Sequence, residues 1–342
     1  MEDTIQSNGE PLVSAPPSSL AKFEFKGDGL EYFKIWIVNI LLTIITLGIY
    51  SAWATVRNNR YFYSNLYLDN HNFSYLAQPL TILKGRIIAV IIFAAFTFIS
   101  QSSPVLSIVL GLAFLIAVPY IIIQSLAFSR RMTSYRNIQF RFKAEYGESF
   151  MAFIVWPILG VLSIGILYPL AMVKMSKFMM KNTSYGTSKF NFTGTYSDYG
   201  IIFLTMIGVG LVLGLPIWGI TFMLPALAPF MPLASLLVYL GLGVYFLVQT
   251  NNLFFNKLSL VNHSFNGSLD MVGLAKVIIT NIFLIIITLG LYLPAAKVRM
   301  AKYLANHISM NIIGSMDTFH AAEEQEVNAL GEEMGNVFEL GV

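Results

Sequence analysis

Residues 46–57 have the sequence TLGIYSAWATVR, and the chain repeats this pattern twice without a gap. Residues 163–174 read SIGILYPLAMVK, and residues 288–299 read TLGLYLPAAKVR. Each copy has a hydroxyl side chain two residues before a glycine, and basic residues nine and twelve residues after it. A motif of this length that recurs at wide intervals indicates an internal repeat.

The composition is that of a polytopic membrane protein. Of the 342 residues, 56% are hydrophobic and 11% are charged, and the mean hydropathy is +0.67. Soluble domains carry about 25% charged residues. The net charge of +3 is too small to predict a nucleic-acid partner. Because the chain has no cysteine, disulfides and thiolate metal sites are excluded, and we expect no metal or cofactor.

Hydrophobic runs lie at about residues 35–53, 87–100, 104–129, 150–173, 201–222, 230–255 and 277–296. A membrane-spanning helix needs about 20 apolar residues. Short alternating segments stand before several of the runs, and this alternation predicts strands. They are Phe23–Phe25, Phe73–Tyr75, Phe140–Phe142, Phe190–Phe192 and Phe265–Gly267. Turn-prone residues precede the last four, so the sequence predicts four small hairpins and one lone N-terminal strand.

The predicted organisation has three parts. A polar, disordered segment covers residues 1–20, a membrane domain covers 21–320, and a solvated acidic tail covers 321–342. The membrane domain consists of repeats 21–139 and 140–264 and a truncated third unit, 265–320. The sequence thus predicts a mainly α, polytopic helical membrane protein with internal repeats, glycine-broken helices that span or re-enter, and short cytoplasmic β-hairpins.

Two topologies are open at this point. If all seven runs span the membrane, the middle repeat is inverted and Lys174–Lys189 lies outside. If the three broken runs dip in and return, four spans remain, and every Lys, every Arg and all predicted strands lie inside. The positive-inside rule favours the second topology, whereas the run lengths also permit the first. Both place the C-terminus in the cytoplasm.

The glycine motif supplies the first candidate site. Glycine costs about 1 kcal/mol in a helix interior relative to alanine, and the residue before a proline is biased away from helical geometry. Matching interruptions in internal repeats point to a transporter binding site, whereas small residues also allow close helix packing. The candidate contacts are Thr46, Gly48, Ser163, Gly165, Thr288 and Gly290.

Basic and amide side chains flank each break. The basic pairs are Arg57 and Arg60, Lys174 and Lys177, and Arg299 and Lys302. They either hold an anionic lipid head group or solute, or anchor the segment by snorkelling. Asn39 and Asn281 each lie nine residues before their glycine, where an amide either contacts a solute or hydrogen-bonds across helices.

Residues 25–33, FKGDGLEYF, together with residues 46–57, resemble the YjgN-like family of bacterial inner-membrane proteins, over about residues 21–315. Family members often have proline before the tryptophan. Ala52 takes that place in the first copy, while Pro169 and Pro294 keep it in the others. The resemblance implies a multi-pass inner-membrane protein of a family with no settled function, and it implies no catalytic residues.

Two functions are compatible with these patterns. One is a channel or facilitative carrier for a small solute, with a path among the glycine-broken helices. The alternative is a non-transporting module that binds anionic membrane lipid or a partner protein through its basic cytoplasmic face. We do not expect an enzyme, because no ionisable residue lies centrally in a hydrophobic run and no catalytic motif is present. The oligomeric state is left open.

Overall fold

A computed structural model of the chain describes residues 18–101, 103–314, 317 and 319–327. Of the predicted disordered segment 1–20, only residues 18–20 are described, and for them the prediction is wrong, because they lie in a strand. The acidic tail beyond residue 327 lies outside the described residues.

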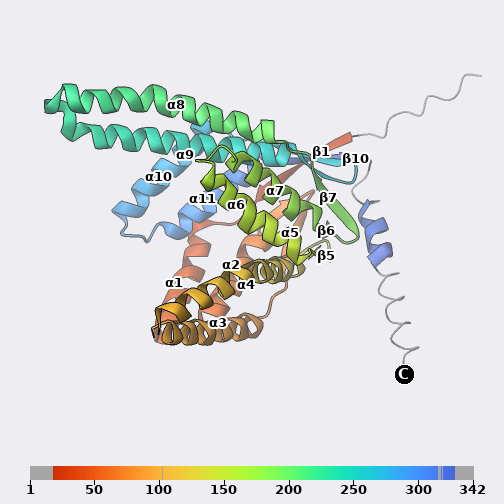
Figure 1. The fold of residues 1–342 in the computed structure, drawn as a ribbon. Coiled ribbons are helices and arrows are strands. Elements are labelled where there is room, and N and C mark those ends of the chain that lie inside the picture. Colours follow the sequence, from red (N-terminus) through yellow and green to blue (C-terminus); the bar gives the residue numbers. More distant parts are fainter. Residues whose placement is uncertain (1–17, 102, 315–316, 318, 328–342) are drawn as a thin grey trace, which may run out of the picture.

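Ten short strands form one closed antiparallel barrel (Figure 1). Every strand pairs with its neighbours in the sequence, and β1 pairs with β10 to close the ring. The strands are β1 (Ser18–Phe25), β2 (Leu66–Leu68), β3 (His71–Tyr75), β4 (Thr133–Tyr135), β5 (Ile138–Phe142), β6 (Thr183–Tyr185), β7 (Ser188–Phe192), β8 (Leu258–Leu260), β9 (His263–Gly267) and β10 (Ile308–Ile313). Closure leaves no unpaired strand edge within the barrel.

The connections between successive strands alternate between short turns and helical hairpins. Helical hairpins join β1 to β2, β3 to β4, β5 to β6, β7 to β8 and β9 to β10. The five insertions are α1 (Gly29–Ile45) with α2 (Ser51–Ser64), α3 (Pro79–Ser100) with α4 (Pro104–Arg131), α5 (Tyr146–Phe150) to α7 (Tyr168–Lys181), α8 (Tyr196–Met223) with α9 (Met231–Asn256), and α10 (Met271–Ile287) with α11 (Leu293–Asn306). The third includes a π-helical turn at Met151–Val155 and α6 (Trp156–Leu162), and a 3₁₀ turn at Pro225–Phe230 joins α8 to α9. All five project from the same end of the barrel (Figure 1).

The predicted fold class, a mainly α protein with separate short hairpins, is wrong. The hairpins are joined into the closed barrel, and β1 is not a lone strand, since it pairs with both β2 and β10. The physical reason is that a short hairpin is marginally stable alone, so each one gains by pairing with the hairpins on either side.

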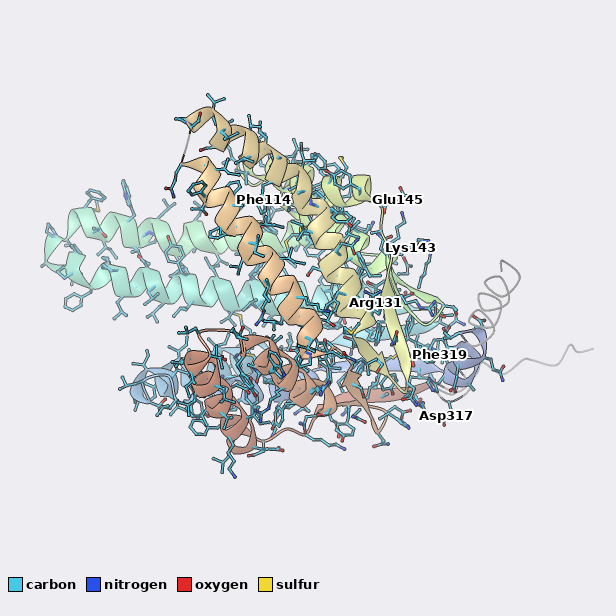
Figure 2. All side chains as sticks on the ribbon, turned by 90° about the horizontal axis from the view of Figure 1, so that it is seen from below. Phe114, Arg131, Lys143, Glu145, Asp317 and Phe319 are labelled. Atoms are coloured by element: carbon cyan, nitrogen blue, oxygen red, sulfur yellow. The ribbon has the colours of Figure 1, made fainter. Side chains whose placement is uncertain are left out.

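The described chain has four helices that are long and apolar enough to cross a membrane, and not seven. They are Pro79–Ser100, Pro104–Arg131, Tyr196–Met223 and Pro225–Asn256. Their apolar side chains point outward along most of their length (Figure 2). The helices of the three glycine-broken runs are shorter, because each run turns back at its glycine.

The three turns share one backbone conformation. Gly48, Gly165 and Gly290 have φ values of +92°, +88° and +90°, in the region that L-residues rarely adopt. A Cβ atom at Gly48 or Gly165 would meet no atom within 4 Å. Backbone conformation therefore requires these glycines, and close helix packing does not.

Candidate functional site

Five phenylalanines line the barrel, one from each odd-numbered strand. They are Phe23, Phe73, Phe140, Phe190 and Phe265, here called the phenylalanine ring. Taken in this order, each member's aromatic side chain has its centroid 6.3–6.5 Å from the centroid of the next. The pairing register places each opposite one residue of the next strand: Leu68, Tyr135, Tyr185, Leu260 and Met310. All ten side chains line one cavity of about 280 Å³, here called the lumen.

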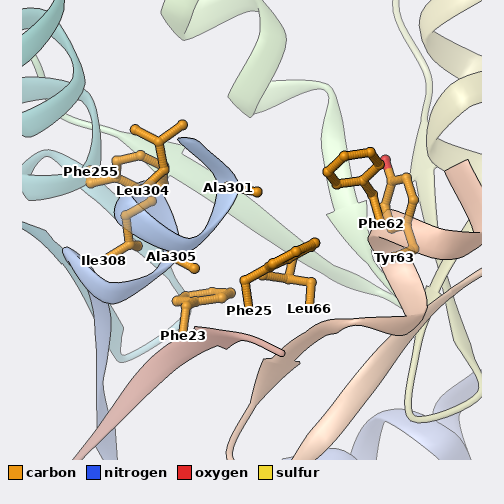
Figure 3. A pocket seen from close by; sticks show the side chains of 10 residues that line it. All are labelled: Phe23, Phe25, Phe62, Tyr63, Leu66, Phe255, Ala301, Leu304, Ala305 and Ile308. Carbon is orange, nitrogen blue, oxygen red and sulfur yellow. The ribbon is translucent and has the colours of Figure 1, made fainter. Parts of the chain in front are cut away.

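A second cavity of about 380 Å³, here called the vestibule, lies where the barrel meets the helices (Figure 3). Residues of β1, α2, β2, α9, α11 and β10 supply its walls. It is lined by Phe23, Phe25, Phe62, Tyr63, Leu66, Phe255, Ala301, Leu304, Ala305 and Ile308. Four of these residues, Phe23, Tyr63, Leu66 and Phe255, also line the lumen. The two cavities therefore share a wall, and together we call them the axial cavity.

A C-terminal helix, residues 319–327, packs against the barrel end away from the membrane-type helices (Figure 2). The Phe319 ring lies 4.7 Å from the His263 ring and joins the apolar cluster inside the barrel. Glu323 is only 4% exposed and accepts a 2.8 Å hydrogen bond from the Thr187 backbone N–H. The predicted solvated tail is thus wrong at Glu323.

The hydroxyls of Tyr135 and Tyr185, two of the tyrosines that line the lumen, both have acceptors. The Tyr135 hydroxyl donates to the Leu68 carbonyl at 2.8 Å, and the Tyr185 hydroxyl donates to the Tyr135 carbonyl at 3.1 Å. Burial raises the pKa of Tyr135 to about 12 and also raises the pKa of Tyr185. Neutral phenols that are already hydrogen-bonded leave the lumen apolar in character.

The sequence matches the family described as "Bacterial protein of unknown function (DUF898)" over residues 21–337. The chain belongs to this family. It is 24% identical to "Inner membrane protein YjgN" of Salmonella typhimurium (strain LT2) over 373 residues, which cover 92% of this chain and 94% of the relative. The protein of the same name from Escherichia coli O157:H7 is 27% identical over 369 residues, covering 89% and 91%.

The same name belongs to an Escherichia coli K12 protein that is 32% identical over 152 residues, 43% of this chain and 37% of the relative. No solved structure matches the chain. The predicted family resemblance is confirmed, and this DUF898 protein is a bacterial inner-membrane protein.

In this DUF898 protein the hydroxyl residues of the repeated motif close the turns. Thr46 Oγ1 accepts a 2.9 Å hydrogen bond from the Tyr50 N–H, and Ser163 Oγ and Thr288 Oγ1 do the same for the residues four positions later. The turns put apolar side chains at the hairpin tips. Leu47, Ile164 and Leu289 are 95%, 94% and 93% exposed. The motif thus builds a tip and does not line the axial cavity.

The predicted amides pair with the predicted arginines across the limbs of their hairpins. Arg57 Nη1 donates to Asn39 Oδ1 at 3.2 Å and to the Tyr50 hydroxyl at 3.0 Å. The third unit repeats this cluster, with 3.0 Å from Arg299 Nη1 to Asn281 Oδ1. Asn39 and Asn281 are only 3% and 6% exposed. Each cluster therefore fixes the two limbs of one hairpin.

The middle unit replaces this cluster with a cation–π contact, in which Lys174 Nζ lies 5.3 Å from the centre of the Trp156 ring. Lys174 and Lys177 line a surface groove of about 490 Å³. Arg60 donates to the Ala77 carbonyl at 3.2 Å, and Lys302 is exposed. Among the described residues, none of the six predicted basic residues forms an ion pair.

None of the residues that line the axial cavity was predicted from the sequence as a site residue. The recurring Phe-x-Phe segments carried the signal for the phenylalanine ring, but they were interpreted only as strands. The lumen also contains Arg130, from the last turn of α4. Beside Arg131, it looks like an ordinary flanking charge in the sequence.

Proposed function

We propose that this protein binds the alkyl chain of a membrane lipid in its axial cavity. The observation that carries the proposal is the cavity lining. The phenylalanine ring and its partners line the lumen, and the vestibule adjoins it at the helical end of the barrel. The two volumes, about 280 and 380 Å³, are near the lower part of the roughly 300–1,000 Å³ that small-molecule sites occupy.

The position of the vestibule supports a ligand that comes from the bilayer. The helices that could span lie on the vestibule side of the barrel, and so do the exposed apolar tips. None of the five tips, at 46–50, 101–104, 163–167, 224–230 and 288–292, contains a charged residue. By the positive-inside rule, we place the barrel and the C-terminus in the cytoplasm, with four spans and three re-entrant hairpins.

The exposed basic residues on the short hairpins support contact with anionic lipid head groups. Arg57, Arg60, Lys174, Lys177 and Lys302 are exposed. A basic residue near an anionic leaflet contributes about 1 kcal/mol. The lipid head groups that contact these basic residues and the alkyl chain in the axial cavity would both belong to lipids of the cytoplasmic leaflet.

A channel or carrier for a small polar solute has less support. Gly48 and Gly290 lie at exposed tips, whereas the axial route is lined mainly by phenylalanine, leucine and tyrosine. A polar solute would lose most of its hydration there, because the lining is mainly apolar. Solute flux that depends on this protein in liposomes would restore that function. That the protein is not an enzyme stays a prediction from the sequence.

Native mass spectrometry of the detergent-purified protein tests the proposal. The wild-type protein should retain a lipid-sized adduct. Ala301→Trp, which places an indole in the vestibule, should lose it. Asn306→Trp is the matched control, because it adds the same side chain to the same helix at an exposed position.

Equal lipid retention by wild type and both variants, with unchanged helical content, would contradict the proposal. So would a wild-type protein that carries no lipid after mild extraction and takes up none when lipid is added back. Thermal unfolding of both variants separates loss of the cavity from loss of the fold, since overpacking costs about 1–3 kcal/mol.

A further inference from the structure

Arg130 is a cation in the wall of an apolar cavity. It lies in the last turn of α4 and lines the lumen together with Tyr63, a residue that also lines the vestibule. Its Nε atom is buried and has no hydrogen-bond partner among the described residues. A buried donor without an acceptor is rare in folded proteins, and each case requires an explanation.

Among the described residues, no carboxylate forms an ion pair with this guanidinium. The residues that line the lumen and the vestibule include no Asp and no Glu. The ion pairs of the described chain involve Lys26, Arg136, Lys181 and Lys257, and not Arg130. A planar guanidinium matches the two oxygens of a carboxylate or phosphate. An anion that enters the cavity would therefore find a donor ready for it.

We infer that the ligand of the axial cavity is a single-chain lipid with an anionic head group, and that Arg130 is its counter-ion. This inference rests on the proposed binding of an alkyl chain. The head group lies beside Arg130, where lumen and vestibule share Tyr63, and the chain lies against the apolar walls. We specify one chain because the lumen, at about 280 Å³, is the smaller part of the axial cavity.

Probes that share one chain and differ in the head group test the inference. The full-length protein is reconstituted in nanodiscs of neutral phosphatidylcholine. Hexadecanoic acid, hexadecyl phosphate and hexadecan-1-ol, each with a diazirine at mid-chain, are photo-crosslinked over a range of concentrations. We expect the wild-type protein to prefer one or both anionic probes over the alcohol by about tenfold, which corresponds to about 1.4 kcal/mol. The better anion identifies the head group as carboxylate or phosphate.

Substitutions of Arg130 then assign the preference. Arg130→Gln should bring the ratio of anionic to neutral labelling close to one while labelling by the alcohol persists. Arg130→Lys should keep part of the ratio, because lysine retains the positive charge but cannot donate two parallel hydrogen bonds as a guanidinium does. Arg131→Gln is the matched control, since Arg131 is the exposed neighbour on the same helix, and it should keep the full ratio.

The outcomes separate the two proposals. If the alcohol and the anions label the wild-type protein equally well, or if Arg130→Gln keeps the anionic preference, the inference about Arg130 is overturned and alkyl-chain binding stands. If no probe labels residues of the axial cavity, the proposed function fails as well. Labelling of Arg130→Gln by the alcohol shows that this variant is folded.

Discussion

Replacing the tip glycines by alanine should destabilise the protein, although the space around them is empty. Gly48 and Gly165 have φ near +90°, and an added Cβ would meet nothing within 4 Å. The cost is therefore conformational, about 1–3 kcal/mol at each site. The two turns belong to different hairpins, so the costs in Gly48→Ala/Gly165→Ala should add to about 2–6 kcal/mol.

A glycine inside a helix provides the control, because its replacement by alanine should change the stability in the opposite direction. At Gly111 in α4 an added Cβ would also meet no atom within 4 Å, and the φ of this residue is not positive. Gly111→Ala should therefore stabilise the protein, by about 0.5–1 kcal/mol. The same chemical change at an equally open position thus gives opposite results, because only the backbone conformation differs.

Unfolding by SDS in mixed micelles, followed through the four tryptophans, measures both effects as shifts of the midpoint. If Gly48→Ala and Gly165→Ala stabilise the protein as Gly111→Ala does, the chain continues as a helix through these positions. The hairpin tips would then be wrong, and the three short runs would be straight spans.

Three further changes test other parts of the structure. Arg130→Met should stabilise the ligand-free protein by about 1–3 kcal/mol, because it removes a buried donor without an acceptor; a lower SDS midpoint would argue against this. Asn281→Leu should cost about 1–3 kcal/mol, since Arg299 loses its 3.0 Å acceptor, and an unchanged thermal midpoint would exclude that role. Burial lowers the pKa of His320 below 6.5, so the docking of residues 319–327 is fully stable above pH 6.5 and weakens as the pH falls. The protection factors of this helix against hydrogen exchange, corrected for the intrinsic exchange rate at each pH, should be lower at pH 5 than at pH 8, and equal protection factors would contradict the assignment.

Local features of the fold could be predicted from the sequence. Gly48, Gly165 and Gly290 could be located because each turn needs a backbone conformation that glycine favours. The strand phenylalanines could be located because alternation is itself a local pattern. The membrane character followed from composition alone, before any element was placed.

Closure of the barrel could not be predicted in the same way. Strands β2, β4, β6 and β8 have three residues each, too few for alternation to be visible. Strand β10 was missed, because no turn signal precedes Ile308 and its partner β1 lies at the other end of the chain. Pairing between segments so far apart in the sequence depends on all the other strands of the barrel. Neither segment alone contains a sequence pattern that predicts it.

The axial cavity depends on that closure. Phe23 and Phe265 are far apart in the sequence, and only the ring of strands brings them to one lumen. The predicted amides and basic residues were local to the repeated motif, and the structure assigns Asn39 and Arg57 to bracing one hairpin. A cavity between repeats is visible only when the repeats are assembled.

The position of a crosslinked alkyl chain tests lipid binding in the barrel most directly. The hexadecanoic acid probe is photo-crosslinked to the wild-type protein in nanodiscs, and the modified peptides are sequenced by mass spectrometry. We predict adducts on the walls of the axial cavity, on the peptides that contain Phe140, Phe255 and Leu304. Adducts confined to the outward faces of α3 and α8 would contradict a lipid site in the barrel.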